Sequence, residues 1–125
     1  MRTQYHFRRT ARGLSAWNVH VLVEQSSSLL RQRVPLSEIA EIDEPYWANE
    51  RAQQLTCREV VDHARLMLDC DLAFPVILSS DGRVMDGMHR ICKALLEGQS
   101  HIEAVRFVHD PEPDYLGVHP DDLPY

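Results

Sequence analysis

The chain has no apolar stretch that approaches the roughly 20 residues a membrane-spanning helix needs. Its N-terminus also lacks the charged and then apolar segments of a secretory signal peptide. Only three cysteines are present, and no two of them form a C-x-x-C pair, so they fit neither a disulfide framework nor a zinc site. We therefore expect a reduced, cytoplasmic protein with no membrane partner.

Positive charge is also scarce. Lys and Arg together number 13, Asp and Glu number 19, and the formal net charge is -6 at pH 7. This balance argues against attraction to nucleic acid over the whole surface, although it allows a local basic pocket. A length of 125 residues and a hydrophobic content of 44% suit a single globular domain, 1–125. We expect its core at about residues 17–108.

The two ends of the chain are expected to lie outside this core. Residues 1–16 contain arginines but no acidic residue, so they form a basic arm that is solvated, in contact with an anionic partner or paired with the protein's own acidic surface. Residues 109–125 form an acidic tail rich in proline. Because proline cannot occupy a helix interior or a central strand, this tail is either an extended strap or disordered.

The spacing of apolar residues predicts the elements of the core. Apolar side chains alternate over 17–23, which predicts a strand with one buried face. Thr56 and Glu59 form a capping box ahead of an apolar stripe of helical period, which predicts a helix over about 57–69. The other predicted elements are an extended segment with a turn at 33–39, strands at 74–78, 83–86 and 102–108, and a helix at about 88–97.

The stretch from Val84 to Arg90 carries the clearest chemistry. It reads as the end of a strand, an Asp-Gly corner and the first turn of a helix. A helix start presents unpaired N–H groups and the positive end of the helix dipole, so it can hold an anion. Gly87 lets the backbone approach a ligand closely, and His89 and Arg90 add donors. The sequence therefore predicts a phosphate or carboxylate site at Gly87, Met88, His89 and Arg90.

For most side chains at this corner, a structural role is the alternative to a role in ligand binding. Asp86 either caps the helix or holds a Mg²⁺ ion that accompanies a nucleotide. Arg90 either grips phosphate or pairs with an acidic residue such as Asp86. His89 either contacts phosphate or bonds a neighbouring loop. Lys93 follows Arg90 by three residues on the same helix face, which makes it an auxiliary cation.

Residues 74–107, with 33–39, resemble the superfamily of ParB N-terminal domains and sulfiredoxins. The resemblance rests on the R-V-P-L-S-E-I segment at 33–39, which is similar to the R-x-V-P-x-S-E/D-I/L box of ParB-like domains, and on a G-x-H-R corner between a strand and a helix. It implies an α+β fold, a small mixed sheet with packed helices, in which the 88–97 helix starts at a nucleotide-phosphate pocket. The ParB corner handles CTP, the sulfiredoxin corner meets ATP, and some relatives are small-molecule kinases.

The chain departs from the family pattern in two ways, and each departure excludes one activity that the resemblance would otherwise imply. Met88 stands where sulfiredoxins have their catalytic cysteine, and a thioether cannot act as a thiolate nucleophile. Only 18 residues follow Phe107, fewer than the DNA-reading helix-turn-helix domain of partition proteins requires. We therefore expect neither peroxiredoxin repair nor DNA binding without a partner protein.

The leading hypothesis is a ParB-like domain that binds CTP, ATP or a phosphorylated small molecule, with Mg²⁺, at Asp86 to Arg90. Hydrolase or kinase activity would need a base or metal ligand opposite the phosphates. The sequence selects none of the nearby acidic residues, Glu38, Glu41, Asp43 and Glu44. A non-enzymatic partner-binding module is the alternative. A nuclease ranks last because no carboxylate cluster is evident.

The roles of three aromatic and histidine side chains outside the corner also need a prediction. Tyr46 and Trp47 either line a pocket or pack a loop onto the core. His63 lies off the centre of its helix stripe, and we expect a partly exposed helix residue there.

Overall fold

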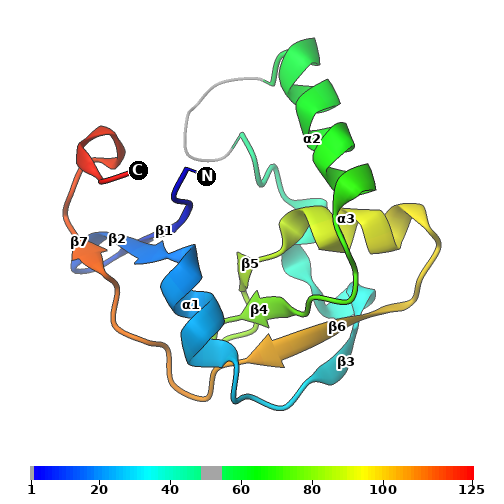
Figure 1. The fold of residues 1–125 in the computed structure, drawn as a ribbon, viewed down its shortest axis with the longest axis horizontal. Helices are drawn as coiled ribbons and strands as arrows, with labels where there is room; N and C mark the ends of the chain where they lie inside the picture. The colour runs from blue at the N-terminus through cyan, green and yellow to red at the C-terminus, as the bar shows by residue number, and fades with distance from the viewer. Residues whose placement is uncertain (1, 49–54) are drawn as a thin grey trace.

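The computed structural model describes residues 2–48 and 55–125, which form two β-sheets and three α-helices (Figure 1). This architecture confirms the predicted α+β class. The strands are β1 (Tyr5–Thr10), β2 (Gly13–Asn18), β3 (Gln32–Pro35), β4 (Val76–Leu78), β5 (Val84–Asp86), β6 (His101–Arg106) and β7 (Tyr115–Leu116). The helices are α1 (Val19–Ser26), α2 (Cys57–Asp69) and α3 (Met88–Leu96), with short 3-10 turns at Leu36–Glu38, Ala40–Asp43 and Pro120–Asp122.

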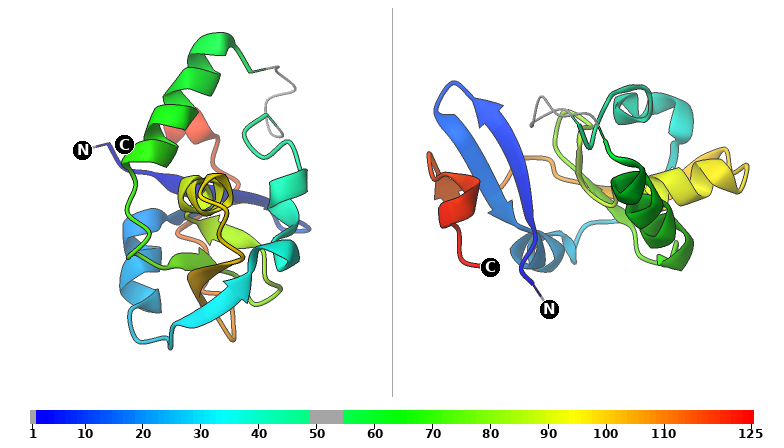
Figure 2. Two further views of the ribbon diagram at one scale, coloured as in Figure 1. Left: turned by 90° about the vertical axis from the view of Figure 1, so that its right-hand side faces the viewer. Right: turned by 90° about the horizontal axis from the view of Figure 1, so that it is seen from above.

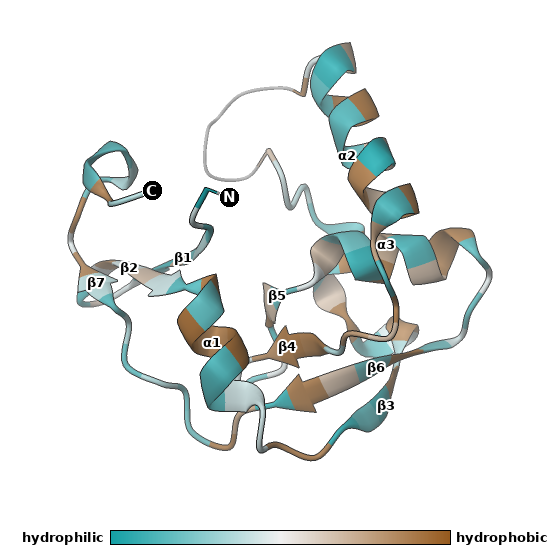
Figure 3. Cartoon of the chain, viewed as in Figure 1, coloured by the Kyte–Doolittle hydropathy of each residue, from teal (hydrophilic) through white to brown (hydrophobic). Residues whose placement is uncertain are grey.

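The four-stranded sheet has the order β3-β6-β4-β5 and carries the core on both faces. β4 and β6 are parallel, whereas the other pairs are antiparallel, so the sheet is mixed. Because side chains alternate along a strand, Val76 and Leu78 face α3, and Ile77 faces α1. β4 is therefore apolar along its whole length (Figure 3).

The second sheet, with the order β1-β2-β7, joins the two ends of the chain. β1 and β2 form an antiparallel hairpin, and β7 pairs with the other edge of β2. The indole N–H of Trp17 donates to the carbonyl of Pro111 at 2.8 Å, which ties the tail to β2. The basic segment over 1–16 is thus an ordered hairpin and not a loose terminus, and of the alternatives it shows pairing with the protein's own acidic residues, since Arg12 lies 3.2 Å from Glu112 and Arg8 lies 3.9 Å from Asp81. The tail is an ordered strap. Figures 1 and 2 show this sheet on the side of the molecule opposite α2 and α3.

The strand predicted over 17–23 is also wrong, because β2 ends at Asn18 and α1 begins at Val19. The side chain of Asn18 accepts a hydrogen bond from the backbone N–H of His20 at 2.9 Å and caps the helix. The alternating valines of this segment are compatible with either structure. The cap and the burial of Leu22 decide for the helix.

Local signals located the remaining elements well. α2 spans the predicted 57–69, and its capping box between Thr56 and Glu59 is present. The predicted helix at 88–97 and the strands near 76, 84 and 102 lie within two residues of their expected ends. α2 packs mainly on α3 and buries none of its residues fully. No helix in the described part of the chain is long and apolar enough to cross a membrane.

Candidate functional site

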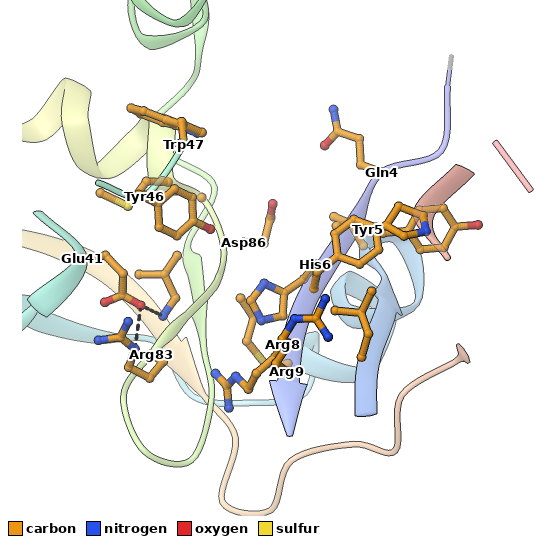
Figure 4. Close-up of a pocket in the computed structure, with 18 of the residues that line it drawn as sticks. Gln4, Tyr5, His6, Arg8, Arg9, Glu41, Tyr46, Trp47, Arg83 and Asp86 are labelled. Carbon is orange, nitrogen blue, oxygen red and sulfur yellow. Dashed lines mark hydrogen bonds and ion pairs between the residues drawn. The ribbon is translucent and has the colours of Figure 1, made fainter. Parts of the chain in front are cut away.

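A cleft of about 1310 Å³ lies between the two sheets (Figure 4). Strand β1 forms one wall of this cleft, and the C-terminal residues 117–121 and Tyr125 also line it. The other wall consists of β5, the start of α3 and the segment 41–47. The side chains that Figure 4 labels on the two walls are Gln4, Tyr5, His6, Arg8 and Arg9 on the first, and Glu41, Tyr46, Trp47, Arg83 and Asp86 on the second.

The corner between β5 and α3 opens into this cleft. Gly87 is the N-cap of α3 and has φ +110°, a backbone conformation that favours glycine. A Cβ at this position would lie 2.6 Å from Cγ1 of Val76, so there is no room for a side chain. No side chain caps the helix, and Gly87, Met88 and His89 line the cleft. The first-turn N–H groups of α3 therefore meet the conditions for an anion site.

Asp86 and Arg90 bind each other rather than the helix end. Arg90 Nη2 lies 3.1 Å from Asp86 Oδ2 and donates to the carbonyl of Pro75 at 3.3 Å. Asp86 is therefore not the helix cap, although it lines the cleft. Of the alternatives weighed for Arg90, the structure shows the ion pair. Arg90 does not line the cleft, so a phosphate contact from this side chain would require the ion pair to open.

Lys93 is directed away from the corner. Its Nζ donates to the carbonyls of Leu68 and Cys70, at 3.1 and 2.7 Å. These carbonyls belong to the C-terminal end of α2, where a cation is favourable because the last carbonyls of a helix lack partners. Lys93 thus joins α3 to α2 and does not line the cleft.

A pair of histidines lies beneath Trp47 at the top of the cleft. His63 Nδ1 and His89 Nε2 are 2.8 Å apart, and one of the two nitrogens must be the donor. The indole stacks on both imidazoles, with centroid distances of 4.2 Å to His63 and 4.9 Å to His89. Burial lowers the pKa of His89, and the neighbouring His63 and Arg90 lower it further. This environment therefore disfavours the protonated form of His89.

His63 is a partly exposed helix residue, as predicted, but its stacking on Trp47 was not predicted. Trp47 combines the two roles that were proposed as alternatives, because it lines the cleft and packs against the core. No local pattern brings residues 47, 63 and 89 together, since each belongs to a different element.

Glu41 is the only one of the four acidic candidates that is buried in the described structure, with 3% exposure. Its Oε2 accepts a hydrogen bond from the backbone N–H of Val84 at 2.6 Å and lies 3.3 Å from Nε of Arg83. Its Oε1 has no hydrogen-bond partner among the described residues. Arg83 also binds both carboxylate oxygens of Glu44, at 2.9 and 2.7 Å, which lowers the pKa of that carboxyl group.

The same wall carries Tyr46, whose pKa is raised to about 12 by burial and by the charges of Glu41 and Asp86. The phenol is therefore protonated at every physiological pH and can donate a hydrogen bond into the cleft. The candidates Glu38 and Asp43 are exposed and do not line the cleft.

Strand β1 brings arginines to the opposite wall. Arg8 donates to Oγ of Ser79 at 3.2 Å and lies 3.9 Å from Asp81. Arg9 is exposed, and the described residues supply it with no ion pair or side-chain hydrogen bond. The guanidinium of Arg2 lies 4.3 Å from the centre of the Tyr125 ring. These arginines belong to the predicted basic arm, and no local pattern in the sequence places them at a cleft.

The carboxylates at the cleft do not form a resident metal site. Oδ2 of Asp86 is held by Arg90, and residues 2–48 and 55–125 contain no group of three His, Cys, Asp or Glu side chains suited to a metal ion. A Mg²⁺ ion that arrives with a nucleotide needs only one or two protein carboxylates, because phosphates and water supply the other ligands. Asp86 is a candidate for that role alone.

No protein-family model, curated protein or solved structure matches this chain. Its function must therefore be argued from the cleft itself.

Proposed function

We propose that the chain binds a nucleotide or another phosphate-bearing small molecule in the cleft between β1 and the start of α3. One observation carries this proposal. The uncapped amide end of α3, at Gly87 to His89, faces the arginine-bearing strand β1 across the same cleft. An oxyanion placed between these walls would receive backbone N–H groups from one side and guanidinium groups from the other, and both favour negative charge.

The remaining cleft residues suit the rest of such a ligand. Tyr46 and Trp47 offer aromatic surface beside the corner, where a nucleobase could pack. The resemblance of residues 33–39 and 74–107 to ParB-like domains supports CTP or ATP as the first ligands to test. Mg²⁺ would accompany the phosphates, with Asp86 as the candidate protein ligand.

Binding is a firmer proposal than catalysis at this cleft. Glu41 and Glu44 line it, but both are occupied by Arg83, and Glu41 also holds the N–H of Val84. Glu44 can act as a base only if its ion pair with Arg83 opens, and the unpartnered Oε1 of Glu41 is buried. Hydrolase or kinase activity therefore needs a separate test, which is a measurement of phosphate release. A nuclease stays the least favoured reading.

A cytoplasmic setting belongs to the same proposal. The three thiols of Cys57, Cys70 and Cys92 are free, as a reducing compartment favours.

Calorimetric titration with CTP and ATP, each with and without Mg²⁺, tests the proposal. Arg9→Ala should weaken binding about tenfold, which corresponds to about 1.4 kcal/mol for one charged contact at an exposed site. Arg33→Ala is the matched control, because Arg33 is an exposed arginine on β3 that does not line the cleft. Absence of binding by either nucleotide at millimolar concentration, or equal losses in the two variants, would refute the proposal.

A further inference from the structure

Strand β1 is the edge of its sheet that borders the cleft. The order β1-β2-β7 leaves one side of β1 without a neighbouring strand, and residues Gln4 to Arg9 line the cleft. A free edge presents backbone N–H and C=O groups that can pair with another extended chain. The question is which residues of β1 direct these groups toward the cleft.

The pairing of β2 with its two neighbours shows which residues of β1 are bonded to β2 and which direct their backbone groups toward the cleft. The carbonyls of Leu14 and Ala16 accept hydrogen bonds from Gly117 and Asp114 on the β7 side, at 2.8 and 2.9 Å. Because backbone groups of successive residues point to opposite edges of a strand, Ser15 and Trp17 must point toward β1. Their partners in the register are Arg8 and His6, which are therefore the β1 residues bonded to β2.

The alternate residues of β1 must then face outward. The carbonyl of Gln4 accepts from the backbone N–H of Val19 at 3.0 Å, which fits the same alternation. It follows that Tyr5, Phe7 and Arg9 direct their N–H and C=O groups to the free edge. No other backbone group in the described part of the chain is hydrogen-bonded to these three residues.

The facing strand β5 is also a sheet edge, but a side chain closes it. Glu41 extends its carboxylate to the backbone N–H of Val84 at 2.6 Å and is itself buried. Among the described residues no such carboxylate covers β1. The cleft therefore has one closed edge and one open edge.

Charge indicates what could occupy the open edge. Arg8 and Arg9 lie next to each other on β1, and Arg2 precedes them, whereas the carboxylates of the facing wall are already held by Arg83 and Arg90. Antiparallel pairing of β1 with a second copy of itself would place Arg8 and Arg9 of both copies on one short strand pair, and no acidic residue of β1 would offset their repulsion. An acidic strand has the opposite and favourable charge.

The size of the cleft fits such an occupant. Its volume of about 1310 Å³ exceeds the roughly 300–1,000 Å³ of typical small-molecule pockets, so an extended chain along β1 has room beside a small ligand at the start of α3. We propose that β1 is a docking edge at which an extended, acidic segment of a partner protein adds as a further strand. Main-chain hydrogen bonds to Tyr5, Phe7 and Arg9 would give affinity, and the arginines would select acidic side chains.

The probe is a peptide of alternating Glu and Val, seven residues long and blocked at both ends, and amide hydrogen exchange is the readout. On binding, the amides of Tyr5, Phe7 and Arg9 should exchange at least tenfold more slowly, whereas those of His6 and Arg8 should change little because β2 already pairs them. A peptide with Lys in place of Glu should bind at least tenfold more weakly. Equal binding of the two peptides, no binding at millimolar concentration, or protection that does not alternate would overturn the proposal.

Phe7→Pro and Phe7→Val form the matched pair of variants. Both remove the ring, but only proline removes the outward N–H, and proline is tolerated at strand edges. Phe7→Pro should lose at least tenfold in peptide affinity relative to Phe7→Val. If Phe7→Pro does not fold, the same peptide with all its amides N-methylated decides with the wild-type protein. Undiminished binding of that peptide would overturn strand addition, and so would a dimer of the chain paired through β1.

Discussion

Histidine 6 should make the fold acid-sensitive. The centroid of its ring lies 5.5 Å from that of Trp17, and its Nε2 is buried without a partner among the described residues. Burial lowers the pKa of His6 to about 4, and the charge of Arg8 adds to the effect, whereas Asp110 opposes it. The folded protein therefore resists a proton that the unfolded chain accepts.

The lowered pKa of His6 determines the sign and size of the change in stability with pH. The unfolded side chain has a pKa of 6.5 and the folded one a pKa of about 4, so the unfolded state binds more protons between these values. The contribution of His6 to stability is fully present above pH 6.5 and is lost as the pH falls toward 4. Integrated from pH 7.5 to pH 4.5, proton linkage gives a loss of about 2.5 kcal/mol in the free energy of unfolding.

Urea unfolding at pH 7.5 and pH 4.5 measures this loss. The wild-type protein should lose about 2.5 kcal/mol more than His6→Phe, in which no proton can bind, because the other titrating groups contribute equally to both proteins. His20→Phe is the control, since His20 is exposed at the start of α1, and it should behave like the wild type. Equal losses in wild type and His6→Phe would refute the reasoning.

Three further predictions concern the opposite wall. Gly87→Ala should lower the free energy of unfolding by about 2 kcal/mol, because it combines a strained φ of +110° with steric overlap; unchanged urea denaturation would contradict the described corner. Trp47→Leu should raise the pKa of His89 toward 6.5 in an NMR titration by exposing the ring, and a constant pKa would show that the indole does not cover it. Arg83→Met should lower the free energy of unfolding by about 2 kcal/mol, because it leaves Glu41 without its cation. The loss is smaller than the roughly 3–5 kcal/mol expected for a fully buried pair because Arg83 is 40% exposed. Chemical denaturation measures this loss, and an unchanged free energy of unfolding would contradict the prediction.

The sequence predicted the segments whose structure depends on neighbouring residues. The capping box at Thr56 and the apolar stripe after it specify α2, and the hairpin of β4 and β5 turns at Gly82, which has a φ of +83°. The segment 17–23 failed because alternating valines suit a strand, whereas the cap at Asn18 and tertiary burial produce a helix. The hairpin of β1 and β2 was missed because a basic composition was interpreted as a loose end, although Tyr5 and Phe7 already alternate with polar residues.

In the candidate site, too, the residues that depend on local sequence were predicted, and those that depend on tertiary packing were not. Gly87 to His89 were predicted from a local strand-to-helix signature, and the structure places them at the cleft. The wall formed by β1 is about 80 residues earlier in the chain, and no spacing rule connects the two. The pairing of Arg90 with Asp86 and the contact of Lys93 with α2 also depend on tertiary packing. Residue type alone could not distinguish these roles from phosphate binding.

Two-dimensional amide NMR with stepwise addition of ATP or CTP, with and without Mg²⁺, tests the central claim most directly. If the cleft binds phosphate between its two walls, the amide signals of Met88 and His89 should shift together with those of Arg8 and Arg9, at the same ligand concentrations. Shifts limited to residues outside the cleft, or no shifts at millimolar nucleotide, would contradict the account.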